Sequence, residues 1–311
     1  MILITGGLGY LGVRIAAHLL TLGYDVRLAS SRENPIIPAR LGSCELVRID
    51  FNDDELLQKA CDEIDTVIHL AGLDAASSQK DPEAALIVNA LGSLKLLNVA
   101  EKLRIKKFIY MSTVHVYGSP LEGIIDEASL PKPLHPYSIT HRIAEDYVLQ
   151  AHDRGKLSGV VFRLSNAVGS PSTKSGNSWR LVVNDLCKQV VVNKSMKLWS
   201  SEHLSRDFLP ISSVVEAVGH SLVNEKCAGE IFNLSSGVSL TLRELTEIIS
   251  KRSKELFGFE PKVFFDVSSA GGQKVNELLI SNRKIKNTGI EIQSEISDEI
   301  DHILLNCESW F

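Results

Sequence analysis

The chain has 311 residues, five cysteines and a formal net charge of -5 at pH 7. This length is sufficient for a full hydrophobic core, and the slight negative charge gives no electrostatic basis for binding nucleic acid or an anionic membrane. The odd number of cysteines and the absence of C-x-x-C spacing predict reduced thiols and no metal site. No run of 18 apolar residues is present and a predicted strand begins at Met1, so we expect a cytoplasmic protein with neither a membrane span nor a signal peptide.

The amino-terminal segment is the most informative part of the chain. An apolar strand leads into Gly6, Gly9 and Gly12, and an apolar helix is predicted over Val13–Leu22. Glycine permits sharp turns and close approach of the backbone, and the amino terminus of a helix favours a bound phosphate. We assign the turn to Gly6, the approach to a pyrophosphate to Gly9, and the packing of helix on strand to Gly12. The segment predicts a dinucleotide-binding unit.

Strands and helices alternate through the rest of the first half. The apolar pattern predicts strands over Asp25–Ala29, Glu45–Ile49, Asp65–Leu70, Lys107–Met111 and Gly159–Leu164. It predicts helices over Asp53–Ala60, Pro82–Lys102 and Tyr137–His152. This alternation favours a doubly wound parallel sheet that binds its ligand at the carboxyl ends of its strands.

The alternation ends after Arg163. Ser170–Asn177 is predicted to be a loop, Ile231–Leu234 a strand that returns to the first lobe, and Thr241–Ser253 a helix. We therefore expect an α/β protein with a Rossmann-type doubly wound parallel sheet and a smaller C-terminal α/β substrate lobe. The dinucleotide-binding domain comprises residues 1–165 plus about 207–235, and the substrate lobe comprises 166–206 and 236–311.

An ordered series of motifs runs through the chain. It consists of TGGLGYLG over Thr5–Gly12, Asp50, HLAG over His69–Gly72, Asn89, MSTVHVYG over Met111–Gly118, Tyr137, RLSN over Arg163–Asn166 and RDF over Arg206–Phe208. With these motifs the chain resembles the extended short-chain dehydrogenase/reductase family, which includes sugar-nucleotide epimerases, dehydratases and reductases. The resemblance covers nearly the whole chain. It implies a nicotinamide cofactor, a nucleotide-diphosphate sugar substrate and a homodimer.

The resemblance also implies the catalytic residues Tyr137, Thr113 and His141. Tyr137 stands at the tyrosine of the Tyr-x-x-x-Lys motif, the acid or base on the substrate oxygen, and Thr113 stands at the hydroxyl residue that assists it. A phenol of pKa about 10 exchanges protons poorly at neutral pH unless its anion is stabilised. His141 replaces the lysine that supplies this stabilisation and holds the ribose, and imidazole is mostly neutral at pH 7. We expect a slow or pH-dependent enzyme, or a member without catalysis, and favour retained catalysis.

Val114 and His115 separate the subclasses. Sugar-nucleotide 4,6-dehydratases carry Asp-Glu at these positions, and valine cannot transfer protons, so a dehydratase is disfavoured. His115 is either an additional acid or base or a residue that only contacts the substrate, and we favour the second reading.

The end of the second predicted strand indicates the cofactor. NAD-binding folds place an acid there, whereas Ser30, Ser31 and Arg32 suit the 2′-phosphate of NADP. We favour NADP over NAD, although a solvated Arg32 in a site that accepts both stays open. The remaining cofactor contacts implied by the resemblance are Tyr10, Leu11, Asp50, Phe51, Leu70, Ala71, Gly72 and Asn89, together with Tyr137 and His141. We expect His69 to be a packed strand residue.

The substrate contacts implied by the resemblance are less complete. Asn166 and Arg206 stand at residues that contact the diphosphate, Ser78 at a serine that lines the sugar pocket, and Thr113 and His115 beside the sugar. The second diphosphate arginine is absent, and Lys274 is its candidate substitute.

The expected function is NAD(P)-dependent reduction of a keto-sugar on a nucleotide, with Tyr137 as the acid. The alternatives are an epimerase that retains NAD, a weakly catalytic or non-catalytic dinucleotide-binding protein, and a reductase of a ketone without a nucleotide. The homodimer is expected to pair the helices over Pro82–Lys102 and Tyr137–His152, which carry more apolar residues than one buried stripe needs. The surplus residues are Ile87, Val88, Leu91, Ile143, Tyr147 and Val148.

Overall fold

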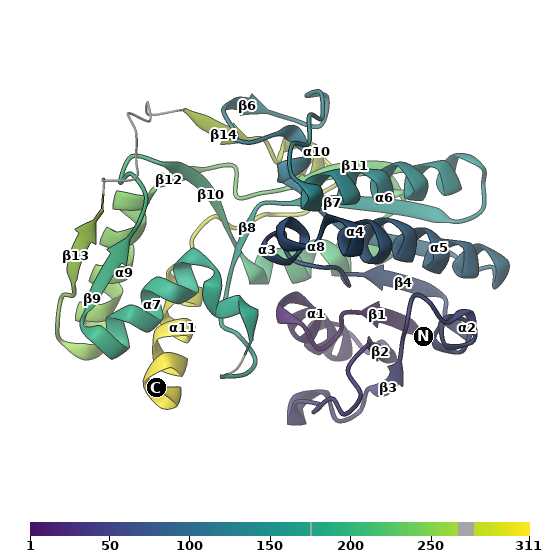
Figure 1. The fold of residues 1–311 in the computed structure, drawn as a ribbon, viewed down its shortest axis with the longest axis horizontal. Coiled ribbons are helices and arrows are strands. Elements are labelled where there is room, and N and C mark those ends of the chain that lie inside the picture. The colour runs from purple at the N-terminus through teal and green to yellow at the C-terminus, as the bar shows by residue number, and fades with distance from the viewer. Residues whose placement is uncertain (175, 267–276) are drawn as a thin grey trace.

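A large parallel sheet forms the centre of the molecule (Figure 1). The computed structural model describes residues 1–174, 176–266 and 277–311. The sheet has the strand order β11-β7-β5-β4-β1-β2-β3. Its strands are β1 (Ile2–Thr5), β2 (Val26–Ser30), β3 (Glu45–Arg48), β4 (Thr66–His69), β5 (Lys107–Thr113), β7 (Ser158–Leu164) and β11 (Glu230–Leu234). The order reverses between β1 and β4, where doubly wound sheets bind their ligands, so the predicted fold class is confirmed.

Helices cover both faces of this sheet, so β1, β2 and β5 are buried along their whole length. α1 (Tyr10–Thr21) and α8 (Ile211–Val223) share one core cluster with Ile2 and Ile4 of β1. α2 (Asp54–Cys61), α5 (Gly92–Lys102) and α6 (Pro136–Asp153) share a second cluster with Leu3. Successive side chains of β1 therefore enter opposite layers, as the period of a strand requires.

The helix predicted over Pro82–Lys102 contains a wider turn. It runs through α4 (Pro82–Ala85), a π-helical segment η2 (Leu86–Leu91) and α5. By length and composition these residues also satisfy the criteria for a membrane span, but half of the segment is buried within the fold, where η2 packs against α6. π-helical turns are rare and are often found at functional sites. Here the turn carries Asn89, whose contacts lie at the candidate site.

The second lobe has its own small sheets and core. β8 (Asn166–Val168), β10 (Ser205–Pro210) and β12 (Ser239–Thr241) form one sheet, and β9 (Ser195–Leu198) pairs with β13 (Lys262–Phe265). α7 (Val182–Asn193), α9 (Leu242–Phe257) and α11 (Ser297–Trp310) pack together beside them. The remaining elements are α3 (Ala75–Lys80), β6 (Gly123–Ile125), β14 (Leu278–Ile280), α10 (Arg283–Lys286), and the 3-10 turns η1 (Ala39–Leu41), η3 (Val114–Tyr117), η4 (Asn177–Arg180) and η5 (Glu225–Cys227).

The chain crosses between the lobes more than once. β11 returns to the large sheet and pairs with β7, as the apolar run over Ile231–Leu234 predicts. β10, however, pairs with β8 and β12, so residues 207–210, expected in the first domain, lie in the small sheet. The chain joins the first lobe again at α8, which packs against α1. The other domain boundaries stay predictions.

α1 holds the two lobes together. The Tyr10 hydroxyl donates to the Gly169 carbonyl at 2.8 Å, and Arg14 forms an ion pair with Glu299 of α11 at 2.7 Å. Glu299 also accepts the Ser212 amide at 3.2 Å. The helix that begins at the glycine segment is therefore fixed against the second lobe.

Candidate active site

At Gly6 and Gly12 the backbone packs too closely against its neighbours to leave room for a side chain. Gly6 adopts a left-handed conformation with φ +65°, and a Cβ there would lie 3.0 Å from the Ala71 nitrogen. A Cβ on Gly12 would lie 2.5 Å from the Gly6 carbonyl oxygen, so the helix backbone packs directly on the turn. Gly9 precedes α1 without a side-chain cap, which leaves the first helical amides available to an anion. This cradle fits a dinucleotide pyrophosphate.

A buried histidine fixes the turn after β4. The Thr5 hydroxyl oxygen accepts the amides of Leu70 at 3.2 Å and Ala71 at 3.3 Å, and lies 2.6 Å from His69 Nδ1. His69 Nε2 lies 2.8 Å from the Ser93 hydroxyl, which donates to a backbone carbonyl at 2.5 Å. Nε2 therefore carries the proton and donates to Ser93, while Nδ1 accepts from Thr5.

Burial lowers the pKa of His69 to about 3, with a smaller contribution from His141, so the ring is neutral. It also packs against Phe51, Phe108 and Tyr110. These contacts agree with the expected packed strand residue, which here orients the predicted cofactor residues Leu70 and Ala71.

Asn89 connects this loop to α6. Its Oδ1 accepts the Leu73 amide at 2.7 Å, and its Nδ2 donates to the Thr140 hydroxyl at 3.2 Å. A Cβ on Gly72 would lie 3.1 Å from Asn89 Oδ1, so the loop passes close to the amide. The structure places Asn89 as a support of the site, buried at its side chain.

Tyr137 and Thr113 come together at the carboxyl end of β5. Tyr137 lies in the first turn of α6, which is capped by His135 and Ser138. Burial raises the pKa of the Tyr137 phenol to about 12; the Asp74 carboxylate adds to the rise, and hydrogen bonding to Thr113 opposes it. The Thr113 hydroxyl oxygen accepts the His115 amide at 3.2 Å. The Thr113 hydroxyl proton can therefore be donated to the phenol oxygen of Tyr137.

His141 is neutral and turned toward the backbone. Its Nδ1 lies 2.8 Å from the Tyr137 carbonyl, and because a carbonyl only accepts, Nδ1 carries the proton. The two rings lie 4.1 Å apart between centroids. Burial lowers the pKa of His141 to about 4, although the bond to the carbonyl opposes this. His141 therefore offers an acceptor at Nε2 where a lysine would offer a cation.

The predicted diphosphate residues meet on the other lobe. Asn166 on β8 donates to the Asp207 carbonyl at 2.8 Å, beside Arg206 on β10. The pKa of His115 is lowered by desolvation and by the positive charge of Arg206, although its side chain remains accessible to solvent. Asn166 and Arg206 therefore lie on paired strands of the small sheet, and His115 lies on η3, close enough to Arg206 for that charge to lower its pKa. Lys274 lies outside the described residues.

Three predicted ligand residues have their polar groups or rings engaged within the protein. Ser78 is fully buried on α3 and its hydroxyl donates to the Leu73 carbonyl at 3.4 Å, so it presents no surface to a sugar. Tyr10 uses its hydroxyl on Gly169. Phe51 lies against Gly92, where a Cβ would approach its ring to 2.9 Å. The ligand contacts assigned to these residues stay predictions.

The predicted cofactor-specificity residues lie at the end of β2. The Ser30 hydroxyl accepts the Arg32 amide at 3.2 Å, and Ser31 and Arg32 are exposed. Asp50 follows β3 and accepts the Asn52 amide at 2.9 Å. Ser31 and Arg32 are therefore accessible at the carboxyl end of the sheet beside the glycine segment, whereas Ser30 is buried.

The sequence did not identify Asp74 as part of the site. Asp74 caps α3, accepts the Ser77 amide at 2.7 Å and accepts Asn177 Nδ2 from the second lobe at 3.1 Å. An aspartate before a six-residue helix signals only a cap, and its proximity to Tyr137 is a tertiary property.

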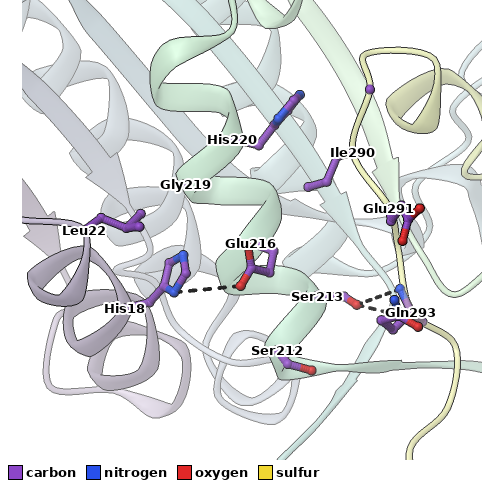
Figure 2. Close-up of a pocket in the computed structure, with 11 residues that line it drawn as sticks. His18, Leu22, Ser212, Ser213, Glu216, Gly219, His220, Ile290, Glu291 and Gln293 are labelled. Atoms are coloured by element: carbon purple, nitrogen blue, oxygen red, sulfur yellow. Dashed lines mark hydrogen bonds and ion pairs between the residues drawn. The ribbon is translucent and has the colours of Figure 1, made fainter.

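A pocket lies away from these residues. Figure 2 shows this pocket of about 600 Å³ between α1, α8 and the segment that carries Gln293. His18 Nδ1 lies 4.0 Å from Glu216, and Gln293 donates its amide to the Ser213 hydroxyl at 3.0 Å. None of its lining residues is a predicted site residue. Across the described ranges, no group of three or more His, Cys, Asp or Glu side chains is arranged to hold a metal ion.

Comparison with known proteins gives a consistent result. The profile of the NAD dependent epimerase/dehydratase family matches residues 2–235. A UDP-glucose 4-epimerase of Bacillus subtilis (strain 168) is 27% identical over 277 residues, covering 81% of this chain and 82% of that protein. The structure of RMD from Pseudomonas aeruginosa complexed with NADPH has a TM-score of 0.79 and 25% identity and covers 99% of both chains. UDP-glucuronic acid 4-epimerase from Bacillus cereus, in complex with UDP-glucuronic acid and NAD, has a TM-score of 0.81 and 21% identity, covering 100% of this chain and 99% of that one.

Proposed function

Because the chain belongs to the NAD-dependent epimerase/dehydratase family, we propose that it reduces a keto-sugar carried on a nucleoside diphosphate, with Tyr137 as the proton donor. The observation that carries the proposal is that the rings of Tyr137 and His141 lie 4.1 Å apart between centroids, with His141 buried and bonded through Nδ1 to a backbone carbonyl, so that no cation lies beside the phenol at position 141. Tyr137 has a pKa of about 12 and His141 one of about 4, so at neutral pH the site holds a neutral phenol beside a neutral imidazole.

A neutral phenol is the form that reduction requires. The carbonyl oxygen gains a proton as its carbon gains hydride, and a reduced nicotinamide supplies that hydride when it is bound. Oxidation of a hydroxyl instead needs the phenolate, and burial, by raising the pKa of Tyr137, disfavours that form at neutral pH. The Thr113 hydroxyl supports the oxygen of Tyr137 as it loses its proton.

We propose NADPH as the preferred hydride source. Ser31 and Arg32 present a hydroxyl and a guanidinium just after β2, and a guanidinium pairs well with a 2′-phosphate. The Pseudomonas aeruginosa structure contains NADPH, whereas the Bacillus cereus one contains NAD, so the family accommodates both. Asn166 and Arg206 are proposed to hold the substrate diphosphate.

An epimerase with retained NAD is the second candidate. The name of the Bacillus subtilis relative supports it. Epimerisation must begin by oxidising a hydroxyl, and the raised pKa of Tyr137 opposes that step. Val114 and His115 continue to disfavour a 4,6-dehydratase, since valine offers no proton.

The test uses the purified protein with NADPH and a panel of nucleoside-diphosphate 4-keto sugars, with loss of the reduced-nicotinamide absorbance as the measurement. We expect turnover, and a loss of at least ~10²-fold in Tyr137→Phe from removal of the general acid. Cofactor affinity should be unchanged in this variant. Interconversion of UDP-glucose and UDP-galactose without added cofactor would instead favour the second candidate, and full activity of Tyr137→Phe would contradict the role of the phenol.

A further inference from the structure

Two oppositely charged side chains are buried together beneath the candidate active site. Glu145 on α6 is 0% exposed and Arg163 on β7 is 1% exposed. The Arg163 guanidinium donates to the Glu145 carboxylate from Nη2 at 2.7 Å and from Nε at 3.0 Å. A buried ion pair adds little net stability, because the cost of desolvating both charges offsets their attraction. Its directional bonds instead fix the relative positions of the elements that carry them.

Glu145 connects α6 to the strand that carries Thr113. It lies eight residues after Tyr137, so both side chains belong to one row along the helix surface. Oε1 of Glu145 accepts the Ser112 hydroxyl at 2.5 Å, and Ser112 immediately precedes Thr113 on β5. One carboxylate therefore joins the helix that presents Tyr137 to the residue beside Thr113.

Arg163 contacts the turn that follows Thr113. Its guanidinium carbon lies 4.7 Å from the centroid of the Tyr117 ring in η3, and the Tyr117 hydroxyl donates to Asn233 Oδ1 at 2.7 Å. In the large sheet Arg163 pairs with Ser112 on one side and with Asn233 on the other. The chain on both sides of Thr113 is thus held by the same buried ion pair.

We propose that Glu145 and Arg163 are positioning residues, which hold α6 and its Tyr137 at a fixed place against the end of β5. The proposal rests on the proposed function, because it assigns the pair to the step in which Tyr137 transfers a proton. Loss of the pair should lower kcat and leave KM nearly unchanged, since other residues bind the cofactor and the substrate. A pair that only stabilised the fold would lower activity in proportion to the fraction of unfolded protein.

The decisive variant removes the whole polar group at once. It combines Ser112→Ala, Glu145→Leu and Arg163→Met, which replace donors and acceptors together by apolar side chains. Such replacements are often neutral for stability, whereas removal of one partner leaves a buried charge without its counter-ion. We therefore expect the thermal unfolding midpoint to stay near that of the wild-type protein. Ser112→Ala alone is the milder variant, because it breaks only the bond to β5 and keeps the ion pair.

The kinetic test uses NADPH and a nucleoside-diphosphate keto-sugar that the wild-type protein reduces. We expect kcat of the triple variant to fall about tenfold or more, and that of Ser112→Ala about threefold, because small displacements of a catalytic group are costly. Asp146→Asn is the matched control. Asp146 follows Glu145 on α6 and also pairs with an arginine, Arg142 at 2.6 Å, but its side chain is 54% exposed. This variant should keep the wild-type kcat.

A second measurement does not depend on activity. The six tyrosines are replaced by 3-fluorotyrosine, and the fluorine resonance of Tyr137 is identified by its loss in Tyr137→Phe. This resonance should shift or broaden in the triple variant and in Ser112→Ala, and it should stay in place in Asp146→Asn.

The outcomes separate the two proposals. A wild-type protein that reduces no keto-sugar would overturn the proposed function, and the fluorine resonance would then decide the positioning role. An unmoved Tyr137 resonance, or a folded triple variant with the wild-type kcat, would overturn the positioning role alone. If the triple variant does not fold, the wild-type kcat and an unmoved resonance in Ser112→Ala would overturn it.

Discussion

We expect the residue at position 141 to affect how readily Tyr137 loses its proton. His141 directs its single proton to the Tyr137 carbonyl and is neutral at pH 7. The phenol, with a pKa of about 12, therefore has no cation one helical turn away. In the reducing direction the phenol is already in its reactive form, so that rate should be insensitive to pH near neutrality. In the oxidising direction the rate should follow the fraction of phenolate.

Replacing His141 by lysine should restore a cation at this position. A positive charge stabilises the phenolate and lowers the pKa of Tyr137, and a charge within about 4–6 Å typically shifts a pKa by 1–3 units. The oxidation rate of the wild-type protein should rise with pH well above 7, and His141→Lys should move that rise to lower pH by a similar shift. The measurement is the initial rate of oxidation of the reduced sugar product across pH. His141→Gln, which adds no charge, should keep the wild-type profile, and an unmoved profile in the lysine variant would refute the electrostatic role.

Arg32 offers a second test at this scale. If its guanidinium pairs with a 2′-phosphate, NADPH should bind more tightly than NADH. Arg32→Ala should then weaken NADPH binding by roughly 10- to 100-fold, the value of one charge-assisted contact of about 1.5–3 kcal/mol. NADH lacks the phosphate and serves as the internal control in the same fluorescence titration. Equal affinities for both cofactors, unaffected by the substitution, would count against NADP.

At the level of elements, the first lobe is predicted from the sequence more completely than the second. The helix predicted over Thr241–Ser253 is confirmed as α9, which is four residues longer at its end, but the short strands of the second lobe are not predicted. The predicted strand over Lys107–Met111 is β5, extended by two residues to Thr113, and the predicted helix over Tyr137–His152 is α6 with one more residue at each end. These elements are long and periodic, and buried parallel strands give continuous apolar runs. β8, β10 and β12 have only three to six residues, so tertiary contacts decide their partners.

The candidate site shows the same contrast between features that patterns along one element predict and features that tertiary contacts decide. The motif residues Thr113 and Tyr137 come together in the structure because each ends or begins a well-predicted element. The π-helical turn at Asn89, the burial of Ser78 and the position of Asp74 were not predicted. Each depends on which side chain from a distant segment fills a given space, and residue patterns along one element do not contain that information.

At the level of the whole molecule, the expected homodimer stays a prediction with a defined surface. Leu86, Ile87 and Leu91 on η2 and Ile139 on α6 are between 39% and 48% exposed, and η2 packs against α6. Four large apolar side chains on neighbouring helices favour a two-fold interface. Val148, which we expected to contribute, is buried in the core of its own subunit.

Light scattering tests the dimer directly. At micromolar concentration the protein should have twice the mass of one chain, and the double substitution Ile87→Asp with Leu91→Asp should yield monomers by placing charges in the interface. Ile36→Asp is the control, because Ile36 is 89% exposed and lies outside this surface. A wild-type monomer would contradict the assignment.

The strand that completes the large sheet is the last part of it to be synthesised. β7 ends at Leu164, and its partner β11 begins only at Glu230, after the chain has passed through the second lobe. Until the ribosome has translated that far, β7 is an open edge, and unpaired edges readily join other chains. The nascent amino-terminal lobe therefore cannot finish folding by itself. Its exposure to misassociation lasts as long as translation of the segment between the two strands, so slow codons within that segment would lengthen the period in which a chaperone is needed.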